Sequence, residues 1–144
     1  MTRPYLVPFK AEHMLEFVNR DTNTRAEFAY ALTRERGGPA FTARVGEDIL
    51  GCAGVILQWP GVGYVWVALD KRAAQYGVWI TRTVRHILND VIRIFNLHRV
   101  EAVVLSDDLT NLRWIQTLGF KIENDIAQMY TTDKRDVVRF ELIS

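Results

Sequence analysis

The chain has 144 residues, of which 49% are apolar and 24% charged, a composition typical of a single folded domain that would span residues 1–144. Its formal net charge of +1 speaks against nucleic acid or a membrane surface as a partner, and no apolar run is long enough to cross a membrane. The only cysteine, Cys52, excludes an internal disulfide and a cysteine-based zinc site, and the lack of a signal-peptide core predicts a cytoplasmic protein.

One short strand and two helices are predicted for the first forty residues. Tyr5–Phe9 alternates weakly between two prolines, which favours a short edge strand because proline cannot donate to a ladder. Ala11–Asn19 carries apolar residues at helical spacing and predicts a first helix. Thr24 and Glu27 have the spacing of a capping box and predict the start of a second helix, which Gly37 and the glycine after it end.

A three-stranded antiparallel meander is predicted next, because the apolar period changes from 3.6 to 2. Phe41–Val45 and Ile49–Leu57 are expected to form a hairpin around a tight turn at Gly46-Glu47-Asp48. A second turn at Trp59-Pro60-Gly61 leads to the strand Tyr64–Leu69. Cys52 lies within the second strand and is expected to be a buried, small apolar side chain.

A strand–helix–strand unit follows the meander. The strand Tyr64–Leu69 leads to an amphipathic helix over Val78–Phe95 and then to the strand Val100–Leu105, which predicts a parallel crossover. A short helix, Asn111–Thr117, is expected to end at Gly119. The residues expected in the core of this half are Ile80, Val84, Ile87, Val91, Val103, Leu118 and Phe120.

Three closing strands are predicted at Phe120–Asn124, Gln128–Thr131 and Val137–Ile143. The element order is therefore strand, two helices, three strands, helix, strand, helix and closing strands. This order predicts an α/β (α+β) fold with a mixed, mostly antiparallel sheet of six or seven strands and helices on both faces.

The junction between Tyr64–Leu69 and the long helix is a candidate anion site. The first N–H groups of a helix have no intrahelical partner and carry partial positive charge, which suits phosphate. Lys71, Arg72 and Arg82 add full charges nearby. An ordinary strand–turn–helix with no ligand is the other interpretation of this stretch, and the sequence alone leaves both open.

The same junction resembles the acetyl-CoA loop of GNAT-superfamily N-acetyltransferases, which reads roughly V-x-P-x-x-[RQ]-x-x-G-x-[GA]. Val67, Arg72 and Gly77 match that pattern, whereas Leu69 stands in place of the common proline and Gln75 in place of the first glycine.

A second stretch, Asn111–Phe120, reads NLRWIQTLGF and resembles the short helix of the family that ends in L-G-F. Together the two motifs and the order of elements cover essentially the whole chain. The form R-W-I-x-x-L-G-F in a chain of this length is also similar to GNAT-like proteins of tailed phages, some of which are thought to be virion components.

The resemblance implies acetyl-CoA as co-substrate, held mainly by backbone groups. Free N–H groups near Val67 and Leu69 would hold the acetyl carbonyl and the pantetheine arm, and the loop Arg72–Gly77 would wrap the pyrophosphate. A glycine there would let phosphate approach and provide a positive φ. The residues expected to bind the co-substrate are Val67, Leu69, Arg72, Ala73, Ala74, Gln75, Tyr76, Gly77, Val78 and Asn111.

The expected reaction is attack of an amine on the thioester, which needs a proton donor for the leaving thiolate. The family often uses a tyrosine four residues before the glycine of L-G-F, and Ile115 occupies that position here. Tyr130 or Tyr76 would have to substitute as the acid. Glu101 is the candidate base, although its neighbours also fit a side chain that faces outward.

Two functions are carried forward from the sequence. The first is an acetyl-CoA-dependent N-acetyltransferase that acts on an unidentified amine, with no metal, nucleic acid or membrane as partner. The alternative is a non-catalytic GNAT-fold structural or binding protein, for instance a phage virion component. A homodimer and a virion assembly are both left open.

Overall fold

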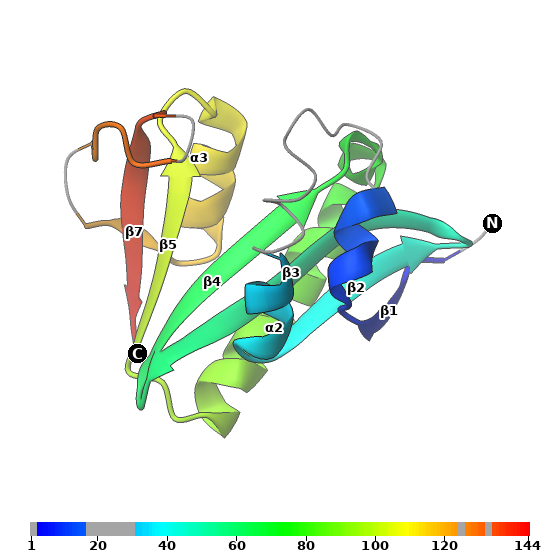
Figure 1. Cartoon of the computed structure of the whole chain (residues 1–144), viewed down its shortest axis with the longest axis horizontal. Coiled ribbons are helices and arrows are strands. Elements are labelled where there is room, and N and C mark those ends of the chain that lie inside the picture. The colour runs from blue at the N-terminus through cyan, green and yellow to red at the C-terminus, as the bar shows by residue number, and fades with distance from the viewer. Residues whose placement is uncertain (1–2, 17–30, 124–125, 132–133) are drawn as a thin grey trace.

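In the computed structural model, which describes residues 3–16, 31–123, 126–131 and 134–144, seven strands form one sheet in the order β1-β2-β3-β4-β5-β7-β6 (Figure 1). All neighbouring strands are antiparallel except β4 and β5, which are parallel. The strands are β1 (Tyr5–Pro8), β2 (Ala40–Val45), β3 (Asp48–Trp59), β4 (Val62–Leu69), β5 (Arg99–Leu105), β6 (Lys121–Ile122) and β7 (Val137–Ile143). The predicted fold class is thereby confirmed.

Helices cover both faces of this sheet (Figure 1). On one face lie α2 (Gly77–Ile94) and α3 (Leu109–Thr117), and on the other lie the 3-10 helix η1 (Ala11–Glu16) and the helical residues 31–36. Each face has its own core. The core under α2 and α3 contains Val55, Leu88, Val91, Leu97, Val100, Ala102, Ile115, Phe120 and Phe140. The core under η1 contains Phe9, Ala11, Ala31, Ile49, Cys52 and Trp66.

Cys52 is buried in the second core, as predicted. Its side chain is 2% exposed, and burial raises the pKa of its thiol to about 11. Because the thiolate is the reactive form, burial and the raised pKa both disfavour a nucleophilic role for this cysteine near neutral pH.

The crossover from β4 through α2 to β5 has the predicted parallel arrangement. Gly61, in the turn before β4, has a φ of 87°, and a Cβ at this position would collide with the ring of His98. The carbonyl of Gly61 accepts the backbone N–H groups of His98 at 2.8 Å and Arg99 at 3.1 Å. The start of β4 is therefore held beside the start of β5.

The strand predicted at Gln128–Thr131 is not formed. Ala127 makes only an isolated bridge to β7, and Met129 has a left-handed φ of 51°. The N–H groups of residues 130 and 131 both donate to the carbonyl of Arg135, at 2.9 and 3.2 Å. The chain forms a turn here instead of an extended strand. The strand prediction is wrong because it used only the spacing of apolar residues, which does not reveal these turn hydrogen bonds.

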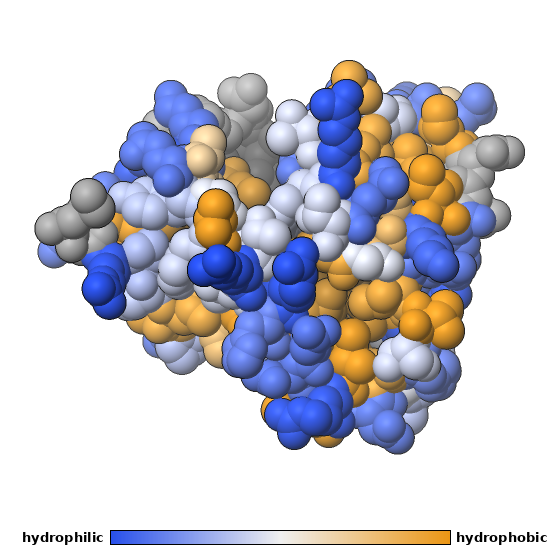
Figure 2. Space-filling model, turned by 180° about the vertical axis from the view of Figure 1, so that it is seen from behind, coloured by the Kyte–Doolittle hydropathy of each residue, from blue (hydrophilic) through white to orange (hydrophobic). Residues whose placement is uncertain are grey.

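The predicted core is only partly confirmed. Ile80, Val91 and Phe120 are buried, whereas Val84, Ile87, Val103 and Leu118 are half-buried. Val84 and Ile87 border an apolar cavity of about 40 Å³ between α2 and the sheet, which accounts for their partial exposure. From the side that α2 and α3 cover, apolar and hydrophilic side chains are interleaved over the surface (Figure 2).

The end of the first predicted helix and the capping box of Thr24 and Glu27 lie outside the described residues. Within the described part of the chain, no helix is long and apolar enough to cross a membrane.

His13 provides a test of the η1 packing by pH. Its Nδ1 lies 2.7 Å from the hydroxyl of Thr42 and accepts the N–H of Lys10 at 3.2 Å, so the neutral ring fits this site. Burial, followed by the charge of Arg44, lowers the pKa of His13 below 6.5. The ring of the unfolded chain therefore takes up a proton at a higher pH than the ring of the folded chain. As the pH falls below 6.5, the unfolded state gains protons first, and the stability that the neutral His13 contributes above pH 6.5 is lost.

We expect the urea midpoint of the wild type to fall more between pH 7.5 and pH 5.5 than that of His13→Gln, which cannot titrate. Equal pH dependence of the two proteins would contradict the packing of His13 described here.

Val91→Ala tests the core under α2. Val91 is 5% exposed, and truncation should lower the free energy of unfolding by about 2 kcal/mol through lost apolar burial and a partial cavity. Val78→Ala on the same helix is the matched control, because Val78 is 70% exposed. Equal urea midpoints for the two variants would refute this helix register.

Candidate functional site

The two central strands, β4 and β5, are paired only at their beginnings. Their register ends after three residue pairs, Val62 with Arg99, Gly63 with Val100 and Tyr64 with Glu101. Beyond these pairs β4 continues to residue 69 along β3, and β5 continues to residue 105 along β7. The facing edges of β4 and β5 therefore lack ladder hydrogen bonds to each other in the middle of the sheet. Backbone polar groups at such a position need another partner, such as water or a ligand.

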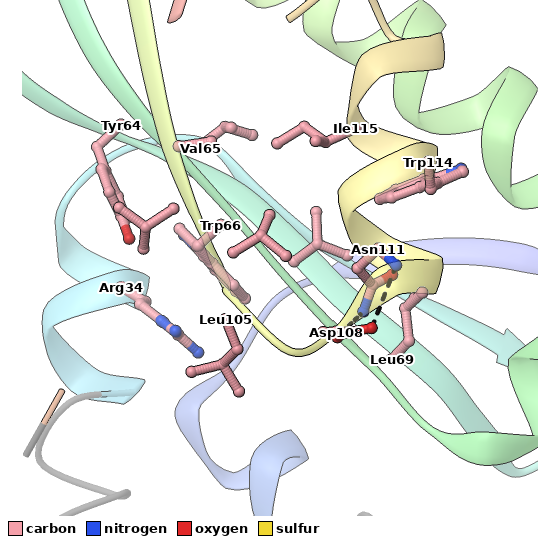
Figure 3. A pocket seen from close by; sticks show the side chains of 14 residues that line it. Arg34, Tyr64, Val65, Trp66, Leu69, Leu105, Asp108, Asn111, Trp114 and Ile115 are labelled. Atoms are coloured by element: carbon pink, nitrogen blue, oxygen red, sulfur yellow. Dashed lines mark hydrogen bonds between the residues drawn. The ribbon is translucent and has the colours of Figure 1, made fainter. Parts of the chain in front are cut away.

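A cleft of about 290 Å³ lies where the two strands separate (Figure 3). We call it the β4–β5 cleft. It is lined by Arg34 from the helical residues 31–36, by β4, by β5 and by α3. The lining residues are Arg34, Tyr64, Val65, Trp66, Val67, Leu69, Ala102, Val103, Val104, Leu105, Asp108, Asn111, Trp114 and Ile115.

The two sides of the cleft differ in chemistry because side chains alternate along β4. Val65 packs against the core under α2 and α3, whereas Tyr64 and Trp66 belong to the core under η1. Figure 3 shows Arg34 and Tyr64 at one side of the cleft and the α3 residues at the other. The side under α3 therefore combines aliphatic side chains with Asp108, Asn111 and Trp114, whereas the other side combines two aromatic rings with a guanidinium group.

Helix α3 forms a firmly held wall. Asp108 caps the helix by accepting the backbone N–H of Asn111 at 3.2 Å, and it also accepts the side-chain amide of Asn111 at 2.7 Å. The indole N–H of Trp114 donates to the hydroxyl of Thr81 on α2 at 2.9 Å. Ile115, which stands where the family has its tyrosine, is 7% exposed and lines the cleft. Asn111 lines the cleft, and its role in binding the co-substrate stays a prediction.

The turn predicted at Asp70–Tyr76 is a 3-10 helix, η2 (Lys71–Tyr76), that leads directly into α2. Asp70 has a fully buried side chain and caps η2 by accepting the N–H of Arg72 at 3.0 Å. The Arg72 side chain turns back to the same carboxylate, with Nε 3.0 Å from Oδ1, and to Asp48 at 3.1 Å. The hydrogen bond to Asp70 raises the pKa of Arg72 above its ordinary value. Arg72 therefore ties η2 to the β2–β3 turn.

The remaining residues of the predicted loop are mostly exposed. Ala74, Gln75, Gly77 and Val78 face solvent at the start of α2, whereas Ala73 is buried and its N–H donates to the carbonyl of residue 70 at 2.9 Å. Gly77 has a helical φ of −55°, so the expectation that this position needs a positive φ is wrong. A Cβ on Gly77 would meet no protein atom within 4 Å.

Neither predicted catalytic side chain lines the cleft. Tyr130 is 52% exposed in the segment after β6. Glu101 pairs with Arg99, at 3.2 Å between Oε1 and Nε, in a charged cluster that also contains Glu123 and Glu141. Their catalytic roles stay predictions.

Trp66, which the sequence places on the same face of its strand as Tyr64, lines the cleft and packs in the core under η1. Arg34 is a site residue that the sequence analysis did not single out. Arg34 comes from a helical segment thirty residues earlier, and no local pattern indicates its contact with β4. Within the described residues, no group of three or more His, Cys, Asp or Glu side chains could hold a metal ion.

No protein-family model and no curated protein matches the sequence. Solved acetyltransferases match the structure over nearly its whole length. Ard1 from Thermoplasma volcanium has a TM-score of 0.78 with 17% identity over 97% of each chain. The IAA acetyltransferase from Bacillus cereus has a TM-score of 0.76 with 15% identity over 99% of this chain and 100% of that one. A GNAT-family acetyltransferase from Bacillus anthracis has a TM-score of 0.72 with 9% identity over 98% and 95%. The chain therefore has the fold of the GNAT N-acetyltransferases, as the resemblance implied.

Asp70→Ala tests the cap of η2. Loss of the cap should lower the free energy of unfolding by about 0.5–2 kcal/mol, which a urea titration measures. Asp70→Asn is the matched control, because its amide oxygen can still accept the N–H of Arg72. An alanine variant as stable as the wild type would show that Asp70 does not hold this turn.

Proposed function

We propose that this protein is an acetyl-CoA-dependent N-acetyltransferase that transfers an acetyl group to an amine by direct attack on the thioester. The observation that carries the proposal is the separation of β4 from β5 beside the start of α2. That separation leaves unpaired backbone edges along a cleft, and the helix start provides N–H groups for an anion. The matched acetyltransferases support the same function through their shared fold.

The cleft fits a narrow, amide-containing arm such as that of acetyl-CoA. Val67 and Leu69 line it from the strand whose edge lacks a β5 partner, so their backbone groups can pair with amides of the arm. Asn111 lines the opposite wall and offers its side-chain carbonyl. When bound, the co-substrate supplies an activated acetyl thioester.

The pyrophosphate would lie at the exposed start of α2. Ala74, Gln75, Gly77 and Val78 are exposed there, and Tyr76 lies among them half-buried. The backbone N–H groups of this stretch and the helix dipole favour a negative charge. The remaining two residues of the predicted set would act indirectly, since Ala73 is buried and Arg72 is held by two carboxylates.

The chemistry needs N–H groups for the tetrahedral oxyanion and a proton for the leaving thiolate. Backbone N–H groups beside Val67 would serve the oxyanion. Ile115 cannot donate a proton, so we propose Tyr64, whose side chain lines the cleft, as the acid ahead of Tyr130. Glu101 pairs in parallel register with Tyr64 and remains the proposed base, acting through water because it does not line the cleft.

A non-catalytic binding protein on the same fold, as a homodimer or within a virion, is the second candidate. Two observations favour it. Ile115 removes the usual proton donor from α3, and Arg72 is engaged by Asp70 and Asp48.

Calorimetric titration of coenzyme A and acetyl-CoA separates the two candidates. We expect the wild type to bind both, and to release free thiol from acetyl-CoA when a reactive amine is present. A folded wild type that binds neither ligand at millimolar concentration would remove the enzyme function, and binding without thiol release would favour the binding protein.

The variant Gly77→Val tests whether the pyrophosphate binds at the start of α2. A Cβ there meets no protein atom and the φ is ordinary, so the variant should fold with an unchanged melting temperature. A side chain at this position would instead crowd a phosphate, and coenzyme A affinity should fall about tenfold, or about 1.4 kcal/mol. Unchanged affinity would move the pyrophosphate away from the start of α2.

A further inference from the structure

Arg34, Tyr64 and Trp66 form the wall of the β4–β5 cleft on the side of η1, and we call these three residues the aromatic wall (Figure 3). The guanidinium carbon of Arg34 lies 4.6 Å from the centre of the Trp66 ring. Phe9 packs edge-on against the same indole, with ring centroids 5.0 Å apart. The indole, 4% exposed, is therefore a rigid support for the guanidinium group.

The hydrogen-bonding groups of this wall are mostly donors. A guanidinium group offers up to five N–H donors and no acceptor, and an indole offers one N–H. The Nε1 of Trp66 is buried and has no hydrogen-bond partner in the described part of the chain. A buried N–H without an acceptor is unfavourable, so an acceptor that reached this wall would be bound the more tightly.

The negative charge among the described lining residues of the cleft lies on α3, across from the aromatic wall. Asp108 is the only carboxylate among these described lining residues, and it belongs to α3, where both of its oxygens already accept hydrogen bonds from Asn111. The aromatic wall contributes the guanidinium group of Arg34 and the indole N–H of Trp66 to the cleft.

We propose that the acceptor amine is a small molecule that also carries a carboxylate, and that Arg34, supported by Trp66, receives this carboxylate. The inference rests on the proposed function. The guanidinium carbon lies over the indole ring, and a planar guanidinium group offers N–H groups in a fork that matches a carboxylate. The cleft volume of about 290 Å³ lies at the small end of ligand sites, which favours a small acceptor.

Matched pairs of acceptors test the proposal. Each pair consists of an amino acid, from glycine through 3-aminopropanoate to 4-aminobutanoate, and the corresponding amide, which has the same amine spacing without the charge. Binding of each compound to the complex with coenzyme A is measured by calorimetry, and turnover is measured with acetyl-CoA. We expect at least one acid to bind about tenfold or more tightly than its amide.

Two variants in the aromatic wall and one control variant test whether this wall causes the preference for the acid over the amide. Arg34→Gln should abolish the preference by raising KM for the acid while kcat and the acetyl-CoA affinity change little. Trp66→Phe keeps an aromatic support but loses the N–H, and should weaken acid binding only in part. Arg36→Gln is the matched control, because Arg36 is an exposed arginine of the same helical segment and does not line the cleft.

The failures of the two proposals are distinguishable. If acetyl-CoA does not bind, the proposed function fails. If acetyl-CoA binds but every acid binds no better than its amide, or none binds at all, the carboxylate proposal is overturned while the proposed function stands. A preference that survives in Arg34→Gln would also overturn it.

Discussion

The parallel pairing of β4 and β5 over only three residue pairs is the constraint on which the rest of the structure depends. Gly61 fixes the closed end, because its carbonyl accepts the N–H groups of His98 and Arg99. At the open end each strand is held by its other neighbour, β4 by β3 and β5 by β7. The sheet is thereby divided in its centre without losing its outer ladders, and the unpaired edges create a demand for hydrogen bonds that a ligand can meet.

The position of this division gives the cleft its two chemically distinct sides. Alternation along β4 directs Val65 toward α2 and α3 and directs Tyr64 and Trp66 toward η1. A co-substrate arm held by strand edges and α3 would then meet an acceptor that enters past Arg34. The hydrogen bond between Trp114 and Thr81 ties α3 to α2, so the wall of the cleft is connected to the helix that starts at the proposed phosphate site.

Local patterns predicted most of the fold. The period of 2 over the meander and the helical spacing of α2 are properties of neighbouring residues, and the structure forms these elements within a few residues of the expected bounds. The 3-10 form of the turn after β4 was harder to predict from the sequence, because it depends on the carboxylate of Asp70, which caps η2. The role of Arg72 depends on Asp48, far away in sequence. Arg34 reaches the cleft only through the tertiary packing of its helical segment against Trp66, which no local pattern encodes.

Amide hydrogen exchange with and without saturating coenzyme A tests most directly whether the separated strands form the binding site. The account predicts that the ligand slows exchange at residues 65–69 of β4 and at residues 74–78, at the start of α2. It also predicts no change in β1 and β2, which lie at the far edge of the sheet. Protection confined to other segments, or a bound ligand that leaves residues 65–69 unchanged, would contradict the claim.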